Sequence, residues 1–119
     1  MQKYIENPLL LQHKNLKNHK FDFRQWVLVL SWEPLDVCVF ESAYLKICGQ
    51  EFDLKQYEDT IRHLSNYSLN KNNSNSKELT MDTKKFEEYM TEMQGKPFVW
   101  QKDMLPKIKD VVWRSLKAL

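Results

Sequence analysis

No apolar run in this sequence approaches the roughly 20 residues needed to span a bilayer. The first residues, MQKYIENPLLLQHK, also lack the basic end and the long apolar segment of a secretory signal. Cysteine is scarce, and in a reducing compartment the two thiols, Cys38 and Cys48, are expected to be small core residues. These absences predict a protein of the cytoplasm with no membrane partner.

Metal sites and nucleic-acid sites lack their usual signals as well. The histidines, His13, His19 and His63, are too scattered for zinc-ligand spacing. Aromatic strands and basic loops could offer a stacking surface to nucleic acid. Against this, the net charge of +2 is small, Trp26 and Trp32 lie in apolar runs, and the strands carry Asp and Glu. We therefore expect no nucleic-acid partner.

The composition is that of a globular chain, 42% hydrophobic and 13% aromatic. Its 119 residues are enough for one domain with a core of its own. We expect residues 1–119 to form a single segment with a mobile surface loop at about 70–79, because the stretch NKNNSNS there has nothing to bury.

The first half of the sequence predicts strands. Residues 2–5 have the pattern of a strand end, and a basic loop is expected at 13–20. A long strand follows from about Phe21 to Trp32, where Glu33-Pro34 ends it. Two shorter strands, 35–40 and 43–47, complete an antiparallel meander with a tight connection at Glu41-Ser42.

The last third of the sequence predicts two helices, at about 83–94 and 104–118. Asp82 is placed to cap the first helix, and Gly95 is placed to end it. The second helix has apolar residues at helical spacing opposite a charged face, and Pro106 is tolerated in its opening turn. Strands followed by helices give an α+β fold.

Three charged residues share one face of the predicted long strand. In KFDFRQWVLVL, residues 20–30, side chains alternate between faces, so Lys20, Asp22 and Arg24 point the same way. They precede residues 26–30, which are expected to be buried on both sides. One interpretation is an exposed strand end with a screened ion pair. The other is a pocket floor, where one cation faces phosphate, the other faces a carboxylate, and the acid orients a cation or accepts from a ribose hydroxyl.

Four blocks occur in the order QKYIENPLLL (2–11), KFDFRQWVLV (20–29), Tyr44–Lys46 and HLSNYSLNK (63–71). Together they resemble the tubulin tyrosine ligase-like family, ATP-grasp enzymes that join an amino acid to a carboxylate of tubulin. The run RQWVLVLSWEPLDVCVF is more similar to the glycine-adding branch than to the glutamate-adding one. The implied fold is a partial ATP-grasp domain, an antiparallel β-meander followed by two C-terminal helices.

The resemblance implies a nucleotide site. The opening tetrapeptide matches the hinge between ATP-grasp lobes, which reads the adenine edge, and the charged strand matches residues that hold the ribose and phosphates. A Ser-Asn pair matches a Thr-Asn pair that contacts ATP in relatives. The positions so implied are Gln2, Lys3, Tyr4, Ile5, Lys20, Asp22, Ser65 and Asn66.

Two further positions are implied to be catalytic. Arg24 matches the family's catalytic arginine, expected to stabilise the acyl-phosphate and the incoming carboxylate through its planar fork. Lys46 stands where relatives usually carry a second arginine, and a lysine cannot make the same bidentate contact with the amino acid. The family's magnesium ligands, a downstream Asp and a Glu-x-Asn, have no match here. The sequence is therefore expected to be a central slice of a ligase, inactive as a free chain.

The expected activity of the whole enzyme is ATP- and Mg²⁺-dependent addition of glycine to glutamate side chains of tubulin through an acyl-phosphate. Its partners would be the acidic C-terminal tails of tubulin, and its location the cytoskeleton, including the axoneme of the cilium. Two alternatives stay open: a polyglutamylase fragment, and a non-catalytic relic that binds nucleotide or tubulin. The relic would bind through Lys14, Lys17, Lys20 and the cationic face of the last helix.

Overall fold

The structure is a computed structural model that describes residues 2–70 and 79–119. The chain forms two compact units, one made of residues 1–23 and 45–81 and the other of residues 24–44 and 82–119. Most of the loop predicted at 70–79 falls outside the described residues, and the single domain over 1–119 stays a prediction.

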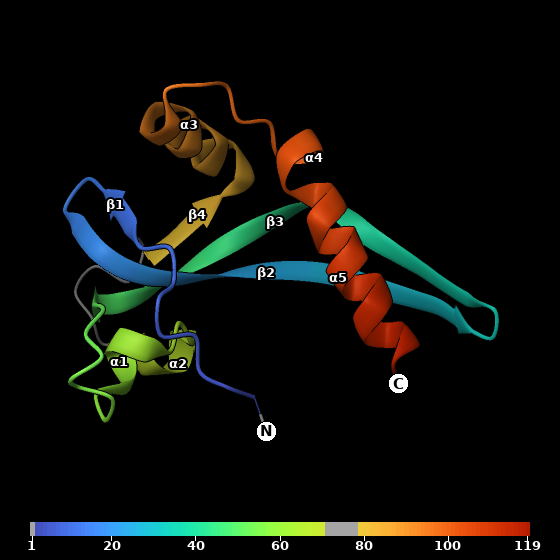
Figure 1. Ribbon diagram of the computed structural model, residues 1–119, viewed down its shortest axis with the longest axis horizontal. Helices are drawn as coiled ribbons and strands as arrows, with labels where there is room; N and C mark the ends of the chain where they lie inside the picture. The colour runs from blue at the N-terminus through green and yellow to red at the C-terminus, as the bar shows by residue number, and fades with distance from the viewer. Residues whose placement is uncertain (1, 71–78) are drawn as a thin grey trace. The chain divides into compact units, whose positions relative to one another are not determined.

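A four-stranded antiparallel sheet runs in the order β1-β2-β3-β4. Its strands are β1 (Leu11–His13), β2 (Leu16–Trp32), β3 (Leu35–Glu51) and β4 (Thr80–Asp82) (Figure 1). Glu33-Pro34 separates β2 from β3, as predicted. With the helices that follow the sheet, the fold is α+β and compatible with a partial ATP-grasp domain, which confirms the predicted fold class.

The basic loop predicted at 13–20 is wrong. Leu11 and His13 of β1 pair with His19 and Leu16 of β2, and only the turn at Lys14-Asn15 separates the two strands. The polar composition of this stretch favoured a loop, but the stretch forms the start of β2, in which Leu16 and His19 are buried. Residues 2–5, predicted to end a strand, have no regular secondary structure.

The two short strands predicted at 35–40 and 43–47 form one continuous strand, β3. Glu41-Ser42 lacks the glycine and asparagine that a two-residue hairpin loop favours, and the extended backbone continues through it. Beyond it, Leu45 and Ile47 alternate inward and are buried in the first unit.

The first unit contains a small apolar core and two short helices, α1 (Thr60–His63) and α2 (Tyr67–Asn70). In Figure 1 these helices lie beside the end of β3. The buried apolar residues of this unit are Leu11, Leu16, Leu45, Ile47, Cys48, Leu79 and Met81.

The second unit contains α3 (Thr83–Gln94), α4 (Trp100–Asp103) and α5 (Leu105–Lys117). The predicted helices correspond to α3 and α5, whereas the single turn of α4 was not predicted. Trp100 is buried, and its indole N–H donates to the carbonyl oxygen of Glu41 at 2.8 Å. The rest of this core consists of Ala43, Phe86, Tyr89, Met90 and Leu105.

The run at 26–30 is not buried on both sides, so that prediction is wrong. Trp26 and Leu28 are 66% and 54% exposed, whereas the alternating residues Val27 and Val29 are half-buried. On β3, Val37 and Val39 line a groove of about 440 Å³ with Val112 and Trp113 of α5. We call the exposed, alternating side chains of β2, Trp26, Leu28, Leu30 and Trp32, the apolar face; Phe40 of β3 is exposed as well. No helix in the described ranges is long and apolar enough to cross a membrane.

Candidate functional site

Lys20 and Asp22 lie on the same face of β2 and form an ion pair. Lys20 Nζ is 3.6 Å from Asp22 Oδ1, and the two side chains are 15% and 45% exposed. Because the carboxylate is nearly half exposed, solvent screens the pair, and we expect it to contribute less than about 1 kcal/mol to stability. The fold therefore depends little on this ion pair, and its charged groups can interact with a ligand.

The HLSN segment joins this pair through two hydrogen bonds. Ser65 Oγ donates to Asp22 Oδ2 at 2.7 Å, and Ser65 is buried. Lys20 Nζ donates to the carbonyl oxygen of His63 at 2.9 Å. Two of the sequence blocks, separated by 43 residues, thus meet in the first unit.

The opening tetrapeptide reaches the same place through Tyr4. Its hydroxyl is 2.7 Å from Nδ1 of His63, and the two rings meet edge to face at 5.8 Å. Lys20 Nζ lies 5.9 Å from the centre of the Tyr4 ring, within the range of a cation–π contact. Burial raises the pKa of the Tyr4 hydroxyl, and the nearby Cys48 and Asp22 raise that pKa further. We call Tyr4, Lys20, Asp22, His63 and Ser65 the Lys20 cluster.

A pocket of about 430 Å³ adjoins the Lys20 cluster and shares two of its residues. Its lining is mostly apolar, as in many sites for small organic ligands. It is lined by Tyr4, Glu6, Leu54, Tyr57, Thr60, His63 and Leu64.

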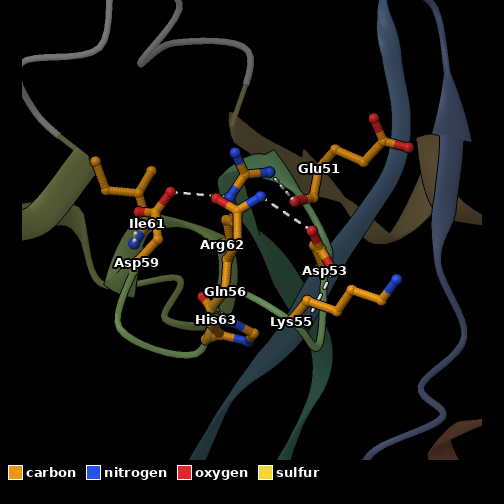
Figure 2. A network of polar contacts seen from close by, with 8 residues as sticks. All are labelled: Glu51, Asp53, Lys55, Gln56, Asp59, Ile61, Arg62 and His63. Carbon is orange, nitrogen blue, oxygen red and sulfur yellow. Dashed lines mark hydrogen bonds and ion pairs between the residues drawn. The ribbon is translucent and has the colours of Figure 1, made fainter.

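A network around Arg62 holds the segment between β3 and α1 (Figure 2). Arg62 Nε donates to Asp59 Oδ2 at 2.9 Å, and Arg62 Nη1 donates to the Glu51 carbonyl at 2.8 Å. Asp59 also caps α1 by accepting from the N–H of Ile61. Asp53 accepts from the N–H of Lys55 and the side chain of Gln56, and these bonds lower the pKa of its carboxyl.

Other predicted site residues lie outside these contacts. Gln2, Lys3 and Ile5 are exposed. Asn66 is also exposed, and its carbonyl oxygen accepts from the side chain of Asn70. Arg24, in the second unit, is exposed, and its side chain makes no hydrogen bond or ion pair within the described ranges. Lys46 is half-buried on β3.

His63 is the member of the Lys20 cluster that sequence reasoning missed. The spacing of the histidines argues against a zinc site, and the residue pattern predicts no other role for His63. The available signal was its position two residues before Ser65, at the start of a block that resembles the family. Its ring interacts with Tyr4 and Gln56 and its carbonyl with Lys20, so it contacts three separate segments.

The Lys20 cluster fits a phosphorylated, hydroxyl-bearing ligand. An ammonium group has three N–H donors, of which Lys20 directs one at the His63 carbonyl and another toward Asp22, so capacity for a phosphate oxygen remains. The carboxylate of Asp22, 45% exposed, can accept from a ligand hydroxyl. Among the described residues, no group of three or more His, Cys, Asp or Glu side chains is placed to hold a metal ion.

Comparison with known proteins assigns this α+β chain, which carries a cation–carboxylate pair on its sheet, to an established family. The chain is a member of the tubulin-tyrosine ligase family, whose model matches residues 1–118. It is 46% identical over 124 residues to tubulin glycylase 3E of Tetrahymena thermophila, and 34% identical over 126 residues to human tubulin monoglycylase TTLL3. Mouse protein monoglycylase TTLL8 is 31% identical over 126 residues.

These alignments cover almost all of this chain and a small part of each relative. Each includes 99% of the chain, but only 9% of the Tetrahymena protein, 15% of the human protein and 14% of the mouse protein. The chain therefore corresponds to about a tenth to a seventh of the length of these relatives.

Proposed function

We propose that this chain forms part of an ATP-dependent ligase that adds glycine to glutamate side chains of tubulin. Membership of the tubulin-tyrosine ligase family supports a ligase, and relatives named as glycylases support glycine as the donor. The acceptor would be the acidic C-terminal tails of tubulin. The enzyme would act at the cytoskeleton, including the axoneme of the cilium.

The Lys20 cluster is the observation that carries this proposal. Lys20 would bind a phosphate oxygen of ATP, and Asp22 would accept from a ribose hydroxyl while Ser65 fixes its orientation. The opening tetrapeptide, residues 2–5, which includes Tyr4, would contact the adenine edge. Asn66 would complete the nucleotide contacts next to Ser65.

Arg24 and Lys46 would act on the reacting groups. Transfer of the terminal phosphoryl group of ATP to a glutamate carboxylate gives an acyl-phosphate; the amine of glycine then attacks the acyl carbon, and phosphate leaves with the bonding electrons. A planar guanidinium at Arg24 would stabilise the negative charge on the acyl-phosphate, and Lys46 would attract the glycine carboxylate. Mg²⁺ would neutralise phosphate charge.

A segment exchange tests this activity. In tubulin glycylase 3E of Tetrahymena thermophila, the matching segment would be replaced by these 119 residues, and transfer of labelled glycine or glutamate to microtubules would be measured. We expect glycine transfer to persist and Arg24→Ala to abolish it. Lys46→Arg should leave transfer unchanged or increase it, because arginine adds a bidentate contact.

Each result has a matched control. The relative with its own segment sets full activity, and circular dichroism of Arg24→Ala establishes that an exposed side chain was removed without unfolding. Glutamate transfer in place of glycine transfer would favour the polyglutamylase alternative. Full activity of Arg24→Ala, with either amino acid, would contradict the assigned role.

A second candidate function, a non-catalytic module that binds microtubules, is favoured by the exposed cations of α5. Lys107, Lys109 and Lys117 are exposed, and Arg114 pairs with Asp110 at 2.9 Å. We expect the free chain to co-sediment with microtubules at low salt and to be released at moderate salt. Lys107→Glu with Lys109→Glu should weaken binding, whereas removal of the tubulin tails with subtilisin should abolish it. Binding that is insensitive to salt would contradict this function.

A further inference from the structure

His63 is a buried histidine with a hydrogen-bond partner at each ring nitrogen. Its exposed fraction is 6%, and its ring lies edge to face with the rings of Tyr4 and Phe52 at 5.8 and 5.6 Å. Nε2 is 3.0 Å from the carbonyl oxygen of Gln56, which can only accept, so Nε2 carries the proton. In the neutral ring, Nδ1 then accepts from the Tyr4 hydroxyl.

The backbone that this ring holds in place contacts both charged residues of β2. The carbonyl oxygen of His63 accepts from Lys20, and two residues later Ser65 donates to Asp22. A shift of the His63 backbone would therefore disturb both bonds at once. The ring also fixes Tyr4, whose own ring lies under the Lys20 ammonium.

From this geometry we infer that His63 is a positioning residue for nucleotide binding: its two ring hydrogen bonds fix Tyr4 and the HLSN backbone so that Lys20 and Asp22 are correctly placed. The inference rests on the proposed function, because it assigns those two side chains to ATP. His63 has its ring nitrogens occupied by Tyr4 and Gln56, so it acts through its neighbours and not by touching phosphate.

Side-chain bonds other than those of the His63 ring also hold α1. Asp59 caps the helix, and Arg62 ties it to Asp59 and to the Glu51 carbonyl. Figure 2 shows these bonds on the chain around His63. Replacing the ring nitrogens should therefore leave α1 in place, which makes a positioning effect separable from unfolding.

The test is a titration of the full 119-residue chain with ATP by isothermal titration calorimetry, with the melting temperature measured for each variant. His63→Phe keeps an aromatic ring and removes both hydrogen bonds. We expect it to raise the Kd for ATP by about 10-fold, since two hydrogen bonds are lost. His63→Asn retains an acceptor near the position of Nδ1 and should recover part of the affinity.

Tyr4→Phe provides the matched partner for a double-mutant cycle. It removes the hydroxyl that His63 accepts and keeps the ring near Lys20, so it should weaken ATP binding in the wild-type background. In the His63→Phe background the same change should have little further effect, because the two residues act through one bond. Phe40→Tyr, at a side chain that is 59% exposed and lies outside the Lys20 cluster and its pocket, should leave the Kd unchanged.

The outcomes separate this inference from the proposed function. ATP binding that is weakened by His63→Phe, with Tyr4 coupled to it, supports both. If the wild-type chain binds ATP and His63→Phe binds it equally well, the positioning role is overturned and the nucleotide site stands. If His63→Phe and Tyr4→Phe weaken ATP binding additively, the inference that the two residues act on the nucleotide through their shared hydrogen bond is overturned. If the wild-type chain binds no ATP while remaining folded, the nucleotide site at the Lys20 cluster and the positioning role of His63 are both overturned, whereas the ligase activity is tested separately by the segment exchange.

Discussion

Cys38 and Cys48 lie on the same strand, β3, in opposite surroundings. Cys38 is exposed, whereas Cys48 is fully buried. Burial raises the pKa of the Cys48 thiol to about 11, and the charges of Lys20 and Asp22 act on it in opposite directions. The expectation that both cysteines are core residues is therefore right for Cys48 and wrong for Cys38.

We predict that iodoacetamide at pH 8 modifies Cys38 and leaves Cys48 intact until the chain is unfolded, because only an accessible thiolate reacts. Peptide mass spectrometry after timed alkylation measures both sites in one sample. Cys38→Ser is the control, since it should remove all reactivity of the folded chain. Equal rates at the two thiols would contradict the buried position of Cys48.

Cys48 also makes stability depend on pH. The thiol ionises near pH 9 in the unfolded chain and near 11 in the folded one, so the unfolded state loses its proton first as pH rises. The free energy of unfolding should fall between pH 9 and 11, by at most about 3 kcal/mol. Denaturant unfolding of the wild type and of Cys48→Ala measures this, because the variant lacks that part of the pH dependence. Identical slopes in the two chains would exclude the effect.

At the residue scale, the sequence predicts which side chains share a face when they lie on one strand. Alternation along β2 places Lys20 and Asp22 on one face, and the structure confirms their pairing. The bonds to His63 and Ser65 could not be predicted, because they depend on how a segment 43 residues away folds over the strand. Arg24 shares the alternation but has no partner among the described residues, so its role stays a prediction.

The helices were the most predictable elements, because their ends are specified locally. Asp82 accepts from the N–H of Lys85 at 2.8 Å, and Gly95 has a left-handed φ of 66° at the C-cap of α3. Both features were expected from the sequence and are confirmed. The strands were less predictable, because pairing across the sheet extends β2 and β3 through polar residues that carry no strand signal of their own.

We predict that Asp82→Ala lowers the free energy of unfolding by about 1 kcal/mol, since the Lys85 N–H loses its capping acceptor. Asp82→Ser keeps an acceptor and should cost much less. Urea unfolding followed by circular dichroism measures both variants. A loss in Asp82→Ser as large as that in Asp82→Ala would show that charge, and not capping, is the important property.

At the scale of the whole molecule, the chain has two compact units with different surfaces. The first contains the Lys20 cluster and a mostly apolar pocket. The second exposes the apolar face defined by Trp26, Leu28, Leu30 and Trp32. The sequence shows that the run at 26–30 is apolar. Whether such a strand is covered on one face or on both depends on the assembled fold, so its burial could not be predicted from the run itself.

We predict that the chain binds the dye ANS strongly through this apolar face, because large exposed patches of this kind are uncommon on isolated domains. Leu28→Thr with Leu30→Thr should reduce ANS fluorescence and change the melting temperature little, since both leucines are more than half exposed. The matched control is Val27→Thr with Val29→Thr on the opposite, half-buried side. That pair should lower the melting temperature and leave ANS binding largely intact; the reverse result would contradict the observed orientation of β2.

The burial of Trp100 gives the second unit an internal optical probe. Trp100 is 2% exposed, whereas Trp26, Trp32 and Trp113 are 66%, 59% and 45% exposed. Iodide in the solvent should quench emission from the three accessible indoles and leave a blue-shifted signal from Trp100. The quenched spectrum would then follow the unfolding of the α3–α5 core without any added label.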